Sequence, residues 1–193
     1  MDTYLSLFEN LNLQILLLSA LLFFIGYAFA PTAYYKKIKW LTAYPFFIIK
    51  LMDSFFKKEH GPIKIFVLLL MLNTISLFIN LISAWGIILP FLLIIYMGLN
   101  VGVVIYHSLE GHFYYAGLLN PVALLELPAA WLSVAMAIQF SLTHFFKIAD
   151  LKEVAFSVYI GYFFYAVMPL LVVAGLIETF LISIGSKTNN SKD

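Results

Sequence analysis

The chain has 193 residues, of which 63% are apolar and 11% are charged. A soluble domain usually has about 25% charged residues, so this composition excludes an ordinary soluble protein and predicts one membrane domain. The net charge of +1, with no block of basic residues, argues against nucleic acid as a partner, and the lack of cysteine excludes disulfides and thiolate sites.

The first apolar segment, residues 11–30, has no charged side chain and is long enough to cross a bilayer. We expect Pro31 to end this helix, because a proline disfavours helical geometry in the residue before it. The preceding residues carry Asp2 and Glu9 rather than a basic region, so we expect a retained transmembrane helix and not a cleaved signal peptide.

Residues 40–58 differ from the other apolar segments because lysines lie within and around them. Their apolar side chains recur with helical spacing, from Trp40 through Tyr44 and Phe47 to Leu51. This pattern predicts an amphipathic helix that lies in the membrane interface. A helix that packs on other helices of the protein is the alternative.

The second and third predicted spans, residues 63–84 and 86–106, are joined by a very short turn, which predicts a tight antiparallel hairpin. Pro90 is expected to interrupt the third span. Gly98 and Gly102 provide a surface that lets another helix approach closely, and we expect a possible homodimer through this surface.

The fourth predicted span, residues 118–146, carries Glu126 between Pro121 and Pro128. Its length suggests a short half-helix before Pro128 and a full helix after it. The fifth span, residues 155–184, carries Pro169 and Glu178 and needs a tilt or a kink.

Residues 185–193 read as a disordered polar tail. The domain is therefore expected to be an all-α, polytopic membrane helix bundle with five transmembrane helices and one interfacial helix.

The lysines suggest how the chain is oriented in a cell membrane. Seven lie between the first and second spans or at the start of the second, and two lie in the tail, on the same side of a five-span protein. Lys147 and Lys152 are the only lysines on the opposite side. Because cytoplasmic loops carry an excess of lysine and arginine, the N-terminus is expected outside and the C-terminus in the cytoplasm.

Four polar residues are expected to form an intramembrane cluster: Glu126, Glu178, Asn100 and Asn73. At 1.5 Å per residue, Glu126, Glu178 and Asn100 lie roughly 9–12 Å below the lysine-rich surface, and Asn73, about ten residues in from the same surface, lies about 15 Å below it. Two neighbouring carboxylates cannot both remain ionised cheaply, so the pair could carry a proton or hold a cation. Alternatively, each glutamate is protonated or accepts hydrogen bonds from backbone amides that the prolines free.

Catalytic motifs are missing from the sequence, and we expect no enzyme activity and no cofactor. There is no Gly-x-Ser-x-Gly, His-Glu-x-x-His or phosphate-binding Gly-x-x-x-x-Gly-Lys-Ser/Thr pattern. His107 and Glu110 have the i, i+3 spacing found in helical metal sites, and His112 follows them. Because the motif is not repeated on a second helix, they are only weak metal-site candidates.

The segment Pro121-Val122-Ala123-Leu124-Leu125-Glu126-Leu127-Pro128-Ala129 resembles the Pro-His-Gly-x-x-Glu-Leu-Pro-Ala stretch of the stage II sporulation protein M family. Val122 and Ala123 replace the histidine and glycine of that stretch. Ile177-Glu178 in the last span, Asn100 followed by Gly102, and the pair Asn73 and Asn80 are further similarities, so the resemblance covers residues 63–184.

The resemblance implies a non-catalytic membrane component of envelope remodelling, which anchors or assembles partner proteins. This is our leading hypothesis from the sequence. The alternative is a proton- or cation-coupled transporter or channel component that uses Glu126 and Glu178. A metal-dependent intramembrane enzyme is a more distant possibility.

Overall fold

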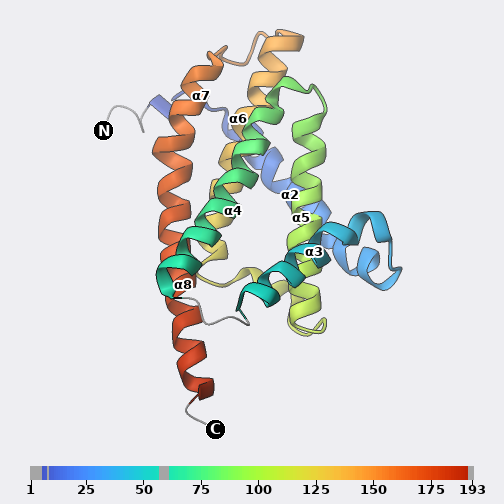
Figure 1. Cartoon of the computed structure of the whole chain (residues 1–193). Helices are drawn as coiled ribbons and strands as arrows, with labels where there is room; N and C mark the ends of the chain where they lie inside the picture. Colours follow the sequence, from blue (N-terminus) through green and yellow to red (C-terminus); the bar gives the residue numbers. More distant parts are fainter. Residues whose placement is uncertain (1–5, 8, 57–60, 191–193) are drawn as a thin grey trace.

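The structure is a computed structural model that describes residues 6, 7, 9–56 and 61–190, including the side chains of all but 53, 55, 56 and 185–190. The secondary-structure elements of this part of the chain are all helical, as expected. Five helical segments are long and apolar enough to cross a membrane: Leu13–Tyr35, Pro62–Trp85, Leu89–Ser108, Ala123–Phe146 and Phe156–Ile184. They form an elongated bundle, with the start of the first segment near one end and the end of the last segment near the other (Figure 1).

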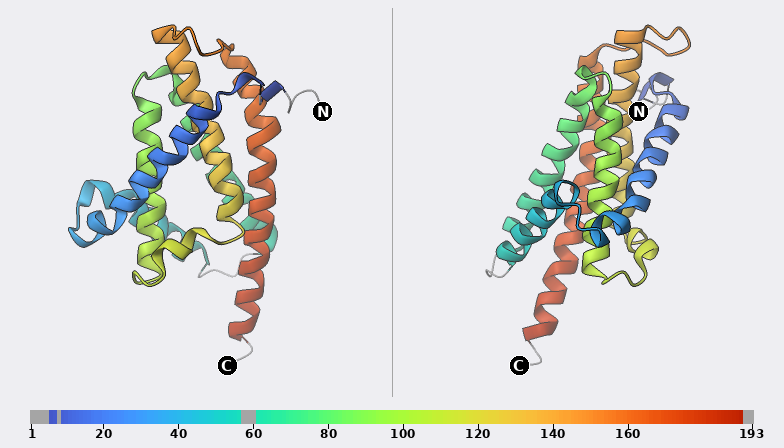
Figure 2. Two further views of the ribbon diagram at one scale, coloured as in Figure 1. Left: turned by 180° about the vertical axis from the view of Figure 1, so that it is seen from behind. Right: turned by 90° about the vertical axis from the view of Figure 1, so that its right-hand side faces the viewer.

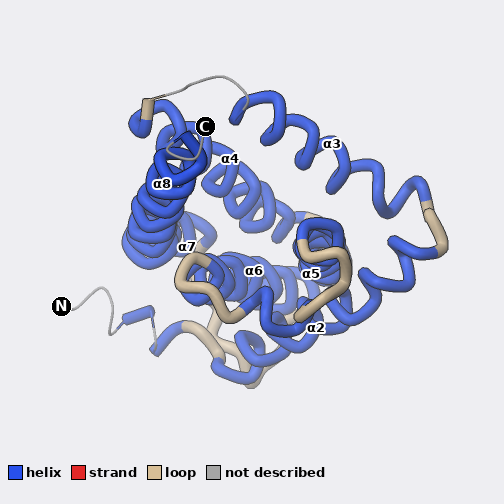
Figure 3. Tube along the Cα trace, turned by 90° about the horizontal axis from the view of Figure 1, so that it is seen from below, coloured by secondary structure: helices blue, strands red, loops and turns tan. Residues whose placement is uncertain are grey.

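Helix α6 (Ala123–Phe146) lies at the centre of the bundle, among α2 (Leu13–Tyr35), α4 (Pro62–Ile82), α5 (Leu89–Ser108) and α8 (Met168–Asn190) (Figure 3). Its middle is rich in alanine and serine, which allow neighbouring helices to come close. Ser133 and Ser141 donate hydrogen bonds to the carbonyls of Leu77 and Ala84, at 2.7 and 2.5 Å. These bonds join α6 to α4 and to the 3-10 turn η1 (Ser83–Trp85) that follows it.

Helices α2 and α5 pack backbone against backbone. A Cβ atom added to Gly26 would lie 1.8 Å from the carbonyl oxygen of Ile95, and one added to Gly98 would lie 2.0 Å from that of Phe23. Only glycine permits an approach this close, so the two helices form one tightly joined pair.

Helix α2 continues through Pro31 to Tyr35, so the prediction that Pro31 ends the helix is wrong. A proline has no N–H, which leaves the carbonyl four residues earlier, here that of Tyr27, without its usual helical donor. The hydroxyl of Tyr114 donates to that carbonyl at 2.5 Å, and the hydroxyl of Tyr27 donates in return to the Tyr114 carbonyl at 2.7 Å. This reciprocal pair replaces the missing hydrogen bond.

Tyr114 belongs to the 3-10 turn η2 (Tyr114–Leu118), which lies outside the spanning helices. Burial raises the pKa of its hydroxyl above the ordinary value for tyrosine. The hydroxyl therefore stays protonated at physiological pH and remains a hydrogen-bond donor to α2.

Helices α4 and α5 diverge from η1 instead of forming a tight hairpin, so that prediction is wrong (Figures 1 and 2). The reason is that the glycine surface of α5 is used by α2, while α4 is bonded to α6. Pro90 does not interrupt α5 either. It lies in the first turn of the helix, where its missing N–H would have no helical partner.

The fourth span contains no half-helix, so this prediction is wrong. Pro121 lies in the turn before α6, and Pro128 lies within the continuous helix. In the fifth span, α7 (Phe156–Tyr162) passes into a π-helical segment η3 (Phe163–Val167) and then into α8. This irregularity directly precedes Pro169, and π-helical turns are a known way of fitting an irregular residue into a long helix.

The C-terminal segment was expected to be disordered from residue 185, but α8 continues as a helix to Asn190. Residues 191–193 lie outside the described part of the chain. In Figures 1 and 2 the end of α8 extends beyond the other helices.

Helix α3 (Lys39–Phe56) forms where the amphipathic helix was expected, although Lys57 and Lys58 lie outside the described residues. It packs on α5 and runs along one side of the bundle (Figure 3). Pro45 and Thr42 are buried against the protein, while Trp40 keeps 76% of its surface exposed. The helix therefore presents one apolar surface to the bundle and another outward.

Candidate functional site

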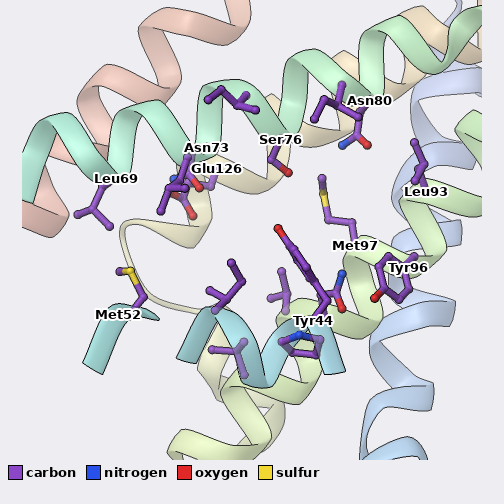
Figure 4. A pocket seen from close by; sticks show the side chains of 18 of the residues that line it. Tyr44, Met52, Leu69, Asn73, Ser76, Asn80, Leu93, Tyr96, Met97 and Glu126 are labelled. Carbon is purple, nitrogen blue, oxygen red and sulfur yellow. The ribbon is translucent and has the colours of Figure 1, made fainter. Parts of the chain in front are cut away.

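The divergence of α4 from α5 leaves a cavity of about 570 Å³ between them. Helix α3 forms one wall, and α6 and α8 each contribute a single residue (Figure 4). Those two residues are Glu126 and Glu178. The walls are mainly apolar, and the polar side chains that line the cavity are Tyr44, Asn73, Ser76, Asn80, Tyr96, Asn100, Glu126 and Glu178.

The structure brings together all four residues of the expected polar cluster, since Glu126, Glu178, Asn100 and Asn73 line this one cavity. Glu126 lies in the first turn of α6, where the positive end of the helix dipole favours a carboxylate. Its Oε1 accepts a hydrogen bond from Nδ2 of Asn73 at 2.5 Å. Glu178 lines the same cavity from α8.

Helix α4 contributes a row of polar side chains that runs along the cavity. Asn73, Ser76 and Asn80 follow one another at i, i+3 and i+7, so they lie on the same face of the helix. Asn80 is only 4% exposed, and its Nδ2 has no hydrogen-bond partner among the described residues. Figure 4 shows its amide directed into the cavity.

Helix α5 provides the facing polar residues, Tyr96 and Asn100, which are one helical turn apart. Oδ1 of Asn100 is buried and has no hydrogen-bond partner in the described part of the chain. The polar cluster predicted from the sequence did not include Ser76, Asn80 or Tyr96, which also line the cavity. Their spacing from Asn73 and Asn100 is the signal that could have identified them, because it places each on the same helix face as an asparagine.

The two glycines predicted to support helix packing, Gly98 and Gly102, pack against α2 of the same chain and are not exposed for contact with a second copy. Gly98 and Gly102 are buried, and a Cβ added to Gly102 would lie 2.5 Å from Cβ of Ala30 on α2. This surface is not available to a second copy of the chain, so the expected homodimer through it is wrong. A dimer through another surface remains a prediction.

The three weak metal-site candidates lie on the surface next to the end of α5. His107, Glu110 and His112 are exposed, and Nδ1 of His107 is 3.1 Å from the hydroxyl of Tyr34. Within residues 6, 7, 9–56 and 61–190, no group of three histidine, cysteine, aspartate or glutamate side chains is arranged to hold a metal ion. His107 instead contacts the aromatic rings of Tyr34 and Phe46.

Comparison with known proteins gives one informative match. No curated protein and no solved structure matches this chain. The profile of the stage II sporulation protein M family matches residues 15–182, which include all of the residues in the cavity and most of the five spans. With five apolar helices and a match over most of its length, the chain is a multi-pass membrane protein that belongs to the stage II sporulation protein M family.

Proposed function

We propose that this protein is a membrane transport component that binds a proton or a cation at Glu126 and Glu178. The observation that supports the proposal is the cavity, which reaches both carboxylates and is lined by further polar groups. An ionised side chain in a membrane span costs about 2.5 kcal/mol or more, and such residues usually face a cavity or pathway. Two of them in one cavity form a site of negative charge that suits a cation.

The transport proposal is favoured over a purely structural role for the glutamates by the way Glu126 is bonded. The structural alternative expects each glutamate to be protonated or to accept hydrogen bonds from backbone amides that the prolines free. The bond to Glu126 comes instead from the side chain of Asn73, on another helix, and the carboxylate also faces the cavity. Such a group can exchange its proton or cation without breaking helical hydrogen bonds.

Flux measurements in liposomes test this proposal. Reconstituted protein is expected to carry protons or potassium ions down an imposed gradient, reported inside the vesicles by a pH-sensitive dye for protons and a potassium-sensitive dye for potassium. Glu126→Gln and Glu178→Gln should each lower the flux by about tenfold, because both remove a charge from the site. Glu110→Gln is the matched control, since Glu110 is exposed on a loop. Absence of flux in the unchanged protein, or equal flux in all variants, would overturn the proposal.

Anchoring or assembly of partner proteins is the second candidate function. The feature that favours it is the end of α8, which extends beyond the bundle and offers a helical segment to a partner (Figure 1). Capture from native membranes through an N-terminal affinity tag should then recover a partner that is lost when residues 185–193 are deleted. Recovery of the same proteins with and without these residues would contradict this role.

Under either candidate function, we propose that the chain is not an enzyme and that it places its C-terminus in the cytoplasm. The orientation is supported by the lysines, seven of which lie between α2 and the start of α4. The absence of catalytic motifs in the sequence supports a role in binding or transport.

A further inference from the structure

We propose that the cation bound in this cavity is a long-chain organic amine that enters from the bilayer. The inference rests on the proposed cation site at Glu126 and Glu178, and it adds the chemical class of the ligand. Four properties of the cavity support it: its volume, its charge, a buried amide directed into it, and the position of its opening.

The volume is too large for a bare ion. The cavity measures about 570 Å³, roughly nineteen times the volume that one water molecule occupies in the liquid. Cavities of this size, with mainly apolar walls and a few polar groups, are typical of sites for organic molecules. The apolar walls, which include Leu69, Leu72 and Met97, fit a hydrocarbon body.

The charge of the cavity indicates which polar group the ligand carries. Glu126 and Glu178 are acidic, and the described residues that line the cavity include no lysine, arginine or histidine. A phosphate or carboxylate would meet only like charge there, whereas a protonated amine can form charge-assisted hydrogen bonds with both glutamates. The site therefore disfavours ordinary anionic lipids and fatty acids.

The side chain of Asn80 is an independent sign that the cavity receives a ligand. It lines the cavity and is 4% exposed, Figure 4 shows its amide on the cavity side of α4, and its buried Nδ2 has no hydrogen-bond partner among the described residues. Seven residues separate it from Asn73, so the two amides are about 10 Å apart along α4. Polar groups spread over this distance suit an elongated ligand better than a spherical ion.

Some of the side chains that line the cavity are also exposed on the outside of the bundle, and these mark its opening. Ile75 and Ile79 of α4 line the cavity and are 47% and 54% exposed, and Tyr44 of α3 is 48% exposed. Both isoleucines belong to a helix long and apolar enough to cross a membrane, so the part of their exposed surface that is directed away from the cavity faces acyl chains. A ligand that passes between them comes from the lipid, so it needs a long apolar chain.

A series of ligands with the same chain and different polar ends tests the proposal. Radiolabelled dodecylamine is added at neutral pH to the full-length protein in lipid nanodiscs, and its retention is measured above that of nanodiscs without protein. Unlabelled dodecylamine should displace the label at a concentration about tenfold lower than dodecanol or dodecanoate. This comparison uses the unchanged protein, so it does not depend on the folding of a variant.

Variants then locate the binding site. Glu126→Gln and Glu178→Gln should each weaken dodecylamine binding by about tenfold, and Glu110→Gln should not change it. Equal displacement by all three ligands, or binding that both cavity variants leave unchanged, would overturn the inference. If cation flux depends on Glu126 but dodecylamine does not bind, the proposed function stands and only the ligand class is wrong. If flux and binding are both absent, both proposals fail.

Discussion

The hydrogen bond between Asn73 and Glu126 joins α4 to α6 at the acidic end of the cavity. Glu126 accepts this hydrogen bond in a cavity whose walls are mainly apolar. A buried polar group that loses its partner costs about 1–3 kcal/mol, so this single amide contributes to the stability of the site.

We predict that Asn73→Leu lowers the free energy of unfolding by about 1–3 kcal/mol. The reason is that it leaves the Glu126 carboxylate without a donor. The measurement is the midpoint of thermal unfolding in detergent. Ser76→Ala, one turn further along the same wall, is the control and should have little effect.

A double-mutant comparison isolates the hydrogen bond. In a Glu126→Leu background, Asn73→Leu should cost much less than in the unchanged protein, because the carboxylate is no longer present. An equal cost in the two backgrounds would show that Asn73 acts through packing and not through its bond to Glu126.

At this scale the sequence predicted the polar cluster from depth alone. Glu126, Glu178 and Asn100 were placed at one level by the rise of 1.5 Å per residue, and the cavity contains all three. Depth does not give the direction in which a side chain points. Helical spacing places Asn80 on the same face of α4 as Asn73, but neither depth nor spacing shows that its Nδ2 is buried without a hydrogen-bond partner in the described part of the chain.

Among the elements, α2 and α5 form the closest contact in the bundle. At Gly26 and Gly98 the two backbones lie so close that an added Cβ atom would overlap a carbonyl oxygen of the other helix. The fit leaves no space for a larger residue, so the pair should be sensitive to the smallest possible substitution.

We predict that Gly98→Ala destabilises the protein by about 1–3 kcal/mol or more, because its Cβ would overlap the carbonyl of Phe23 and force α2 away. The yield of monodisperse protein in detergent and the midpoint of thermal unfolding measure the effect. Gly161→Ala is the matched control. Apart from its own helix, the described residues have no atom within 4 Å of the added Cβ, and alanine favours a helix by up to about 1 kcal/mol, so this variant should be at least as stable as the original. Similar behaviour of the two variants would contradict the close packing of α2 and α5.

The positions of most helices could be predicted from apolar length, but their partners could not. The short turn after α4 led to the expectation of a tight hairpin, whereas Gly98 faces α2. Glycines mark a surface that allows close approach without showing which helix uses it. Pro31 gives a similar lesson, because its effect on α2 depends on Tyr114, a residue distant in the sequence.

The whole molecule has two chemically different ends. One carries α3, the described lysines around it and the loop with Glu110, and the other carries the N-terminal end of α2 and the loop with Asp150 (Figure 1). The absence of cysteine means that a single introduced thiol can report the location of each end.

We predict that a membrane-impermeant maleimide labels Asp150→Cys in intact cells and labels Glu110→Cys only after the membrane is opened. Both side chains are exposed in loops, so the difference depends on the side of the membrane and not on burial. The reverse pattern would show that the lysine-rich end lies outside.

The turn η1 makes the space between α4 and α5 a wedge, with its narrow point at Ser83–Trp85. That point is fixed, because Ser141 on α6 holds the carbonyl of Ala84. From Ile82 to Asn73 the helix is about 14 Å long, so a rotation of about 5° at the narrow point moves Asn73 by about 1 Å. Substitutions in this small turn can therefore act as a lever on distant Asn73, changing the width of the wedge without altering any residue that faces the acids.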